Sequence, residues 1–311
     1  MTKLILLSAF LIGFLQPTIE AQQLPLLTQY PEYYGLINPA SVNRSFLMDN
    51  GRNLSIGGLY YLSTTSELQD IAPETGSVRA ELIVHRWKYK FLLSSYFQYD
   101  KIGITKNTDV YLRGAYIHSF RGHLSKDGLV AGVNFGFNRQ QFLLHELSPN
   151  LIPNDPKIGF VYPPSVNYKD LGLGLYYYRK WKEEGDYFYG GLSAPRIKQN
   201  RLANHYYALL GFSWAANENY FWEFSTWVRY VERVPRQTSI NTRLHFHKVV
   251  WLGIGGIMSP INKPFLTGEL GLNCKAVRFG IAYTYLQSDV QSIFGNALEF
   301  NLSYALDVRP R

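Results

Sequence analysis

The residues that most resemble metal ligands are two histidines two positions apart. His245 and His247 would share one face of a β-strand, as two ligands of a metal ion can. No carboxylate and no further histidine accompanies them at ligand spacing. We therefore interpret them as ordinary lumen and interface residues of the barrel inferred below, and we predict no metal site.

Glycine-rich stretches could cradle a phosphate, and the chain has two of them. Gly253-Ile-Gly-Gly256 and Gly172-Leu-Gly174 are followed by no Lys-Ser/Thr pair and open no predicted helix, so they are not phosphate loops. They are better explained as strand glycines that relieve crowding. The chain also lacks a Gly-x-Ser-x-Gly nucleophile motif. We predict no catalytic residue, no cofactor and no enzymatic activity.

Composition excludes several classes of protein. The 311 residues are 46% hydrophobic, 16% aromatic and 17% charged, whereas a disordered chain is poor in hydrophobic residues and rich in charge. The single cysteine, Cys274, has no partner for a disulfide framework. After residue 20 no apolar run approaches the roughly 20 residues of a transmembrane helix.

The first residues predict a signal peptide. Lys3 precedes an apolar run from Leu4 to Leu15, and Ala21 supplies a small residue at the cleavage site. A membrane anchor is the alternative, but about 12 apolar residues are too few to cross a bilayer. We expect residues 1–21 to be removed, leaving 22–311 as an exported protein.

Alternation of apolar and polar residues dominates the mature chain, and no long stretch keeps a helical period. Near the end, Leu298 and Phe300 fall on one face, and Glu299 and Asn301 on the other. The runs are mostly as long as a tilted membrane strand, about 9–11 residues. Fourteen runs show the pattern: 53–61, 77–87, 90–100, 108–120, 128–140, 170–180, 187–193, 205–214, 220–230, 238–246, 249–259, 267–273, 277–285 and 297–306.

Long and short connections alternate between these runs. Outer-membrane barrels pair long outer loops with short periplasmic turns, whereas a soluble sandwich has no reason to segregate them. We predict an all-β, up-and-down outer-membrane barrel of about 14 antiparallel strands, with both termini in the periplasm. The odd connections would be 62–76, 101–107, 141–169, 194–204, 231–237, 260–266 and 286–296, and the even ones 88–89, 121–127, 181–186, 215–219, 247–248 and 274–276.

Aromatic residues gather near the even turns. Amphipathic rings collect at membrane interfaces, so this placement favours a membrane barrel over a sandwich with an aromatic core. Only Trp227 falls in mid-strand, on the polar face. The aromatic residues near even turns are Trp87, Trp181, Trp214, Trp222, Trp251, Tyr89, Tyr187, Tyr189 and Tyr220.

The polar faces of the strands would line the lumen with charges of both signs. Such a lumen can hold water or can pair with a plug. Residues 22–52 show no alternation and are too apolar for a free tail, so we expect this segment to fold into the lumen. The predicted charged and histidine lumen residues are Arg79, Glu81, His85, Arg113, Glu223, Arg229, Arg243, His245, Arg278 and Glu299.

Short motifs along the mature chain are similar to those of one known family. The first strand is preceded by Gln22-Gln23-Leu-Pro, Thr28-Gln29-Tyr30 and Ile37-Asn38-Pro39-Ala40. The middle contains Leu171-Gly-Leu-Gly-Leu-Tyr-Tyr-Tyr178 and Tyr189-Gly-Gly-Leu-Ser-Ala-Pro195, and the end contains Arg278-Phe-Gly-Ile-Ala-Tyr283. With these motifs the chain resembles the PorP/SprF family of Bacteroidota outer-membrane proteins. It departs from the family at Asn296 and Ala297, where Ser-His is usual.

The resemblance implies a barrel that serves the type IX secretion system, which exports large adhesins and enzymes. Some members are core components connected to periplasmic machinery, and others receive a C-terminal domain of particular adhesins. The implied partners are other secretion components and such a domain, besides outer-membrane lipid and lipopolysaccharide. The plug residues that match family motifs are Gln29, Tyr30, Asn38, Pro39 and Ala40.

The longest predicted loop, 141–169, combines apolar residues with five prolines. An exposed apolar surface of this kind usually marks a binding site, and prolines reduce the entropy lost on docking. The alternative is a lid folded over the barrel mouth. We expect the loop to take up the C-terminal domain of an exported adhesin. The candidate partner-binding residues are Leu143, Leu144, Leu147, Leu151, Ile152, Phe160 and Tyr162.

Two functions therefore remain open: an interaction protein of a secretion system, and a channel or transporter for a small solute. The segment 22–52 distinguishes them, because a fixed plug closes the lumen and a mobile one leaves it open. The net charge of +8 could suggest nucleic acid. In an exported barrel it is better explained by lumen and loop cations, some of which face anionic lipopolysaccharide.

Overall fold

The computed structural model describes most of the mature chain and none of residues 1–26. Within the described residues, no helix has the length and apolar character needed to cross a membrane. The described ranges are 27–48, 52–64, 73–86, 89–103, 105–120, 127–143, 165–181, 186–197, 204–217, 219–232, 234–259, 265–286 and 296–308.

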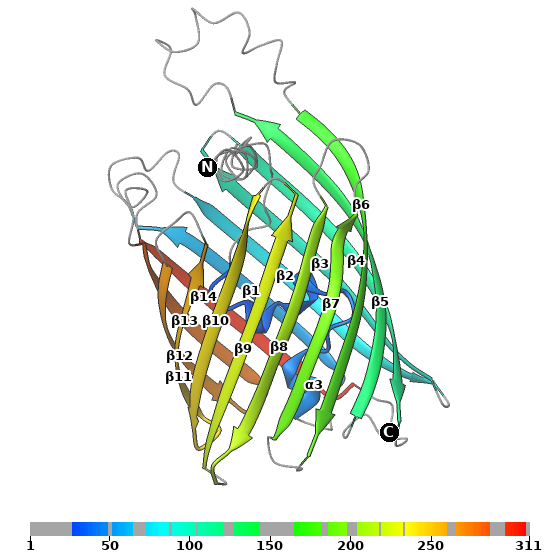
Figure 1. Ribbon diagram of the computed structural model, residues 1–311, viewed down its shortest axis with the longest axis vertical. Coiled ribbons are helices and arrows are strands. Elements are labelled where there is room, and N and C mark those ends of the chain that lie inside the picture. The colour runs from blue at the N-terminus through cyan, green and yellow to red at the C-terminus, as the bar shows by residue number, and fades with distance from the viewer. Residues whose placement is uncertain are drawn as a thin grey trace, which may run out of the picture.

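Fourteen antiparallel strands close into a barrel (Figure 1). Each strand pairs with its neighbours in sequence, and β1 pairs with β14 to complete the ring. The predicted up-and-down barrel is confirmed, and each of the fourteen predicted runs corresponds to one strand. The strands are β1 Leu54–Ser63, β2 Glu74–Arg86, β3 Tyr89–Ile102, β4 Thr105–Ser119, β5 Asp127–Phe142, β6 Ser165–Lys180, β7 Tyr187–Ile197, β8 His205–Ala215, β9 Tyr220–Val231, β10 Val234–Phe246, β11 Val250–Met258, β12 Phe265–Cys274, β13 Val277–Leu286 and β14 Ala297–Leu306.

Alternation along each strand becomes an inner and an outer face. In β3 the side chains of Phe91 and Leu93 are 41% and 51% exposed, whereas Leu92 between them is fully buried. Large apolar side chains are exposed in this way on strands all around the barrel. Such a surface is costly in water and suited to the hydrocarbon core of an outer membrane.

The lengths of the connections differ less between the two ends of the barrel than the sequence predicted. Strands β3 and β4 are separated only by residues 103–104, and β9 and β10 only by 232–233. The predicted loops 101–107 and 231–237 are therefore wrong, because most of their residues belong to strands. These strand ends carry polar residues on both faces, so the alternation fades although the pairing continues. The longest connections are 64–73, 143–164 and 287–296, all at one end of the barrel.

The predicted aromatic belt is correct for some residues and wrong for others. Trp181, Trp214 and Trp222 face outward, as do Tyr89 and Tyr220. Trp87 lies outside the described residues. The residues that instead point into the lumen and are buried are Trp251, Tyr187 and Tyr189. Nearness to a turn does not determine which face a side chain occupies, because successive residues of a strand point to opposite sides.

The described part of the N-terminal segment, residues 27–48, lies inside the barrel (Figure 1). We call these residues the plug. It contains three short helices: η1 Tyr30–Glu32, α2 Tyr34–Ile37 and α3 Arg44–Met48. From Leu27 to Val42 only Ile37 is more than marginally exposed. The plug and the inner faces of the strands together make the core of the molecule.

Candidate functional site

The plug lies directly against the barrel wall where three neighbouring strands carry inward-facing glycines. Gly132, Gly174 and Gly191, on β5, β6 and β7, form what we call the glycine groove. An added Cβ at Gly132 would lie 2.3 Å from the Pro39 carbonyl oxygen, and one at Gly174 would lie 2.1 Å from Asn38 Oδ1. These separations are too short for any side chain, so only glycine admits the plug here.

Hydrogen bonds hold Asn38 in the glycine groove. Asn38 Nδ2 donates to the Leu175 carbonyl oxygen at 3.0 Å, and Asn38 Oδ1 accepts from the Ala40 backbone N–H at 2.8 Å. Ser193 Oγ donates to the Ile37 carbonyl oxygen at 2.7 Å. Pro39 has a fixed φ, which favours the turn that this asparagine stabilises. The Asn-Pro-Ala motif is thus a docking element of the plug.

Two sequence motifs that are far apart in the chain therefore meet in space. The interpretation of Gly174 as a residue that relieves strand crowding was incomplete, because its missing Cβ makes room for Asn38. Gly172 serves a different contact: a Cβ there would lie 2.0 Å from Asn134 Oδ1 and 2.4 Å from the Pro195 carbonyl oxygen. Gly172 therefore accommodates the irregular pairing of β7 with its neighbours.

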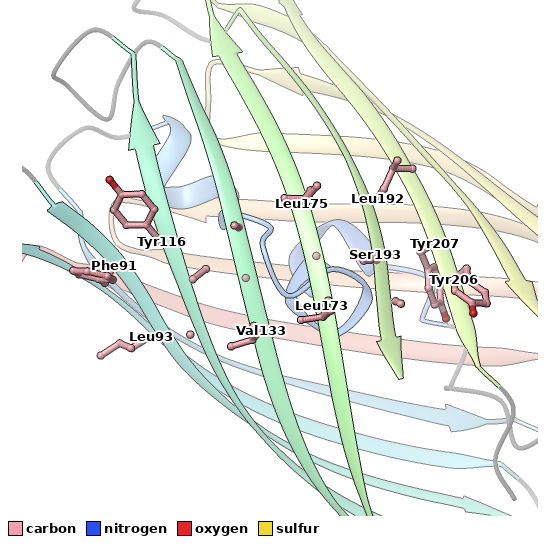
Figure 2. Close-up of a pocket in the computed structure, with 16 residues that line it drawn as sticks. Phe91, Leu93, Tyr116, Val133, Leu173, Leu175, Leu192, Ser193, Tyr206 and Tyr207 are labelled. Atoms are coloured by element: carbon pink, nitrogen blue, oxygen red, sulfur yellow. The ribbon is translucent and has the colours of Figure 1, made fainter. Parts of the chain in front are cut away.

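The outer surface of the same stretch of wall is hollowed. Figure 2 shows it from the membrane side, with the plug behind the strands and Leu173, Leu175 and Leu192 projecting outward. An apolar groove of about 910 Å³ runs over these strands, and its floor includes the small residues Gly114 and Ala131. No charged side chain lines it. In an outer membrane this groove faces hydrocarbon.

A carboxylate on β14 holds the beginning of the plug. The backbone N–H groups of Thr28 and Gln29 donate to the two carboxylate oxygens of Glu299, each at 2.7 Å. Gln29 Nε2 also donates to the Glu299 carbonyl oxygen at 3.2 Å. An added Cβ at Gly280 would lie 2.3 Å from Gln29 Oε1. Glu299 thus satisfies two buried backbone donors, as a plug without its own strand partner requires.

Tyrosines of the plug pack on the aromatic residues that point inward. The Tyr30 hydroxyl donates to the Ser225 carbonyl oxygen at 2.9 Å, and its ring lies edge-on to Trp227 at 5.9 Å. The hydroxyls of Tyr34 and Tyr189 are hydrogen-bonded to each other. The plug thus supplies packing partners for the inward-facing side chains of Trp227 and Tyr189.

A buried group of ion pairs joins the plug to the wall near the end that carries the short turns. We call it the plug cluster, and its members are Glu32 and Arg44 of the plug with Glu223, Arg243, His245, Glu269 and Arg278 of the wall. Glu32 Oε1 lies 2.8 Å from Arg243 Nη1 and 2.9 Å from Arg278 Nη2. Arg44 Nη1 lies 2.6 Å from Glu223 Oε2. Arg243 also contacts Glu269 at 2.8 Å.

The plug side chains of this cluster remain charged despite their burial. Burial by itself would raise the pKa of the Glu32 carboxyl, but Arg278, Arg243 and Arg44 hold that pKa below its ordinary value. Burial would lower the pKa of Arg44, and the Glu223 carboxylate outweighs it and keeps that pKa raised. Burial also raises the pKa of the Tyr30 hydroxyl, so it stays a neutral donor.

A second group of charges contacts the plug at Tyr33 and Ser41. Arg113 Nη2 donates to the Ser41 carbonyl oxygen at 3.0 Å and lies 3.2 Å from Glu81 Oε1. Glu81 Oε2 also accepts from Arg79 Nη1 at 2.7 Å. The Arg79 guanidinium lies over the ring of Tyr33. The contacts of the plug are thus spread over many strands of the wall, including β2, β4, β9 and β14.

One buried cluster contains no plug residue among the described part of the chain. We call it the wall cluster: Arg196 of β7, Asp109 and Tyr111 of β4, and Asp170 of β6. Arg196 Nη2 lies 3.0 Å from Asp109 Oδ2, and Arg196 Nε lies 3.1 Å from Asp170 Oδ2. Sequence reasoning missed this arginine because it falls in the predicted loop 194–204.

The predicted lumen charges are mostly placed as expected. Nearly all of them are buried inside the barrel, and Arg278 is partly buried. His85 is an exception, because it is exposed near the end of β2.

His245 and His247 do not share a strand face: His245 is in the lumen, and His247 begins a turn with φ 49°. Among the described residues, no group of three or more His, Cys, Asp or Glu side chains is placed to bind a metal ion.

Of the candidate partner-binding residues, Leu143 lies within the described part of the chain. Leu143 directly follows β5 and is partly buried. The residues that lie outside the described part of the chain are Leu144, Leu147, Leu151, Ile152, Phe160 and Tyr162. Their role remains a prediction.

Comparison with known families gives one match. The family described as "Type IX secretion system membrane protein PorP/SprF" matches residues 19–304. No curated protein matches the chain.

Solved structures with a similar fold are outer-membrane barrels of low sequence identity. The Ralstonia pickettii toluene transporter TbuX is 10% identical, with a TM-score of 0.53, and the match covers 88% of this chain and 93% of that one. A mutant of the monoaromatic hydrocarbon channel TodX is 12% identical, with a TM-score of 0.50 and coverage of 88% and 94%. CdiB from Acinetobacter baumannii is 8% identical, with a TM-score of 0.50 and coverage of 82% and 60%. At these identities the likeness concerns the fold alone.

Proposed function

The chain belongs to the PorP/SprF family of type IX secretion system membrane proteins, and from this premise we propose that it acts by binding proteins and not by conducting a solute. In this role the barrel is a non-enzymatic outer-membrane component that supports export or surface attachment of adhesins. It does so by binding their C-terminal domain, other secretion components, or both.

The observation that carries this proposal is the plug. Residues 27–48 occupy the lumen and are held by the glycine groove, by Glu299 and by the plug cluster. A lumen filled by the chain itself is poorly suited to passing a solute. The alternative of a small-solute channel draws support from similar barrels that are a toluene transporter and a hydrocarbon channel, but that likeness is one of fold.

The partner surface is expected at the end of the barrel with the long connections. Connections 64–73, 143–164 and 287–296 all leave this end, which we place outside the cell. The end with the short turns is then periplasmic. Connection 143–164 contains most of the apolar and proline residues identified in the sequence, and we assign to it the C-terminal domain of an exported adhesin.

The experiment is to replace residues 145–164 by a Gly/Ser linker of equal length and to measure which adhesins remain on the cell surface. The proposal expects the barrel to stay in the outer membrane and one adhesin to be lost from the surface proteome. A matched control replaces the connection 287–295 in the same way. Normal surface display without 145–164 would mean that this connection is a lid, and the assignment would be wrong.

A further inference from the structure

Three cations lie on the outer face of neighbouring strands, near the end of the barrel with the long connections. They are Lys106 of β4, Arg139 of β5 and Lys169 of β6, and we call them the basic patch. Arg139 and Lys169 are exposed, and Lys106 is partly exposed. Lys106 shares the outer face of β4 with Val110, which is 38% exposed.

Strand pairing brings the three cations close together. Arg139 is paired with Thr108 of β4 and with Asn167 of β6. Lys106 and Lys169 lie two residues away from those partners along the same strands, so each is a diagonal neighbour of Arg139. Diagonal neighbours on one face of a sheet are about 7–8 Å apart. One anionic headgroup can therefore contact more than one of these cations.

The carboxylates at this end of the same strands point the other way. Asp100 of β3, Asp109 of β4 and Asp170 of β6 are all buried inside the barrel. Asp109 and Asp170 are paired there with Arg196. Charges of opposite sign are thus separated onto the two faces of the wall, and the outer face has the positive ones.

The described neighbours on the outer face do not neutralise the basic patch. The Lys106 ammonium lies 5.2 Å from the centre of the Tyr99 ring, a contact that attracts a cation without cancelling its charge. Glu74 is on β2, opposite Lys101 of β3, and accepts a hydrogen bond from the Tyr60 hydroxyl at 2.8 Å. On the described outer faces of β4, β5 and β6, no carboxylate lies beside the basic patch.

Toward the middle of the wall the outer face becomes apolar. Phe137 and Phe135 follow Arg139 on the outer face of β5 and are 50% and 54% exposed. Leu173, which lines the apolar groove in Figure 2, is four residues from Lys169, roughly 13 Å along β6. Cations beside such a surface suit an amphiphile with an anionic headgroup and acyl chains.

We propose that the basic patch binds the phosphate groups of lipopolysaccharide, whose acyl chains lie on the apolar surface next to it. The inference rests on the proposed function for its orientation, because lipopolysaccharide occupies the outer leaflet and the long connections must then face outward. Arginine and lysine bind phosphate oxygens with short, charge-assisted hydrogen bonds. The apolar groove of about 910 Å³ is lined by residues of β3 to β8, a breadth that suits a lipid with several acyl chains.

The test uses the purified full-length protein in dodecyl maltoside, titrated with diphosphoryl lipid A and followed by native mass spectrometry. Arg139→Gln combined with Lys169→Gln removes two exposed cations from the basic patch. The matched control, Arg179→Gln with Arg236→Gln, removes two exposed cations from other parts of the wall. Parallel titrations use lipid A without its phosphates, or add inorganic phosphate as a competitor.

The patch variant is expected to weaken lipid A binding by about tenfold, or about 1.4 kcal/mol. The control variant should change binding by less than about twofold. Lipid A without phosphates should bind the native protein at least about tenfold more weakly than intact lipid A does. Inorganic phosphate should compete no better than chloride of equal ionic strength, because it has no acyl chains.

Four results would overturn the proposal: absence of saturable binding, equal weakening in both variants, tight binding of lipid A without phosphates, or efficient competition by inorganic phosphate. The last result would identify a site for free phosphate and not for a lipid. None of these results depends on surface display of an adhesin, so this proposal and the proposed function can fail separately.

Discussion

Two arginines inside the barrel are each paired with two carboxylates, but one joins strands of the wall to one another and the other joins the plug to the wall. Arg243 lies between Glu32 and Glu269, and Arg196 lies between Asp109 and Asp170. Both arginines are buried. For Arg196 both carboxylates belong to the wall, whereas for Arg243 one of them belongs to the plug.

The difference shows that the structural role of a buried ion pair depends on which segments its partners belong to, since the residue types are nearly the same in both clusters. The wall cluster braces β4, β6 and β7 against one another whatever the plug does. The plug cluster, in contrast, includes charges of the plug, so its ion pairs form only when the plug is docked against the wall. Buried ion pairs add little net stability, but removal of one partner costs roughly 3–5 kcal/mol. Variants of the two clusters should therefore separate plug docking from wall stability.

The largest expected effect comes from removing the plug. A deletion of residues 24–46 removes Glu32 and Arg44, together with the Asn-Pro-Ala motif. The wall cluster contains none of these residues, so the barrel should still migrate as a folded species in an unheated gel. Planar-bilayer recordings should show a steady conductance well above that of the intact protein. An unchanged conductance in the folded deletion variant would mean that the plug does not close the lumen.

The second prediction compares the two clusters directly. Glu32→Gln should weaken plug docking by about 3–5 kcal/mol, because it removes the carboxylate that pairs with the buried Arg243 and with the partly buried Arg278. Transient channel openings are expected with little change in barrel melting. Asp170→Asn should do the reverse, by lowering the thermal stability of the barrel without openings. If both variants open the channel equally, the two clusters are not independent.

The third prediction concerns the glycine groove. Gly174→Ala places a Cβ 2.1 Å from Asn38 Oδ1, and such overpacking typically costs about 1–3 kcal/mol. We expect rare openings, and faster proteolysis of the plug in the purified protein. Gly268→Ala is the control, because a Cβ there meets nothing within 4 Å. Equal rates of channel opening and plug proteolysis in the two alanine variants would mean that the glycine groove does not contribute to plug docking.

The smallest effect is expected from acid. Because the pKa of Glu32 in the folded protein is below its ordinary value, its contribution to docking is complete above the ordinary pKa of about 4.3. That contribution is lost as pH falls through the lower folded value. Openings should therefore increase only below about pH 4, and Glu32→Gln should abolish this step. An increase near neutral pH would point to a different titrating group.

The strands of the wall could be predicted from sequence because the alternation that marks a strand lies within the strand itself. Alternation in runs such as 297–306 reports directly on a strand with one lipid face, and that run matches β14 at both ends. The inward position of Trp251 could not be predicted, since a turn one or two residues away does not determine the face. Arg196 was missed because β7 pairs irregularly with both of its neighbours near this residue, which interrupts the alternation of apolar and polar side chains.

The contacts of the plug could be predicted only in outline. Segment 22–52 was expected in the lumen because it is apolar and lacks alternation. Its partners are far away in sequence: Glu32 meets Arg243, and Asn38 meets the strands that carry Gly132 and Gly174. Periodicity contains no information on such pairs. The family motifs marked the residues on both sides of the groove without indicating that they touch.

The central claim is that the native chain fills its own lumen. The most direct test is a planar-bilayer recording of the intact, purified protein at neutral pH and low voltage. The structure predicts insertion without a steady conductance. A large and stable open conductance would contradict the claim and would favour the small-solute channel.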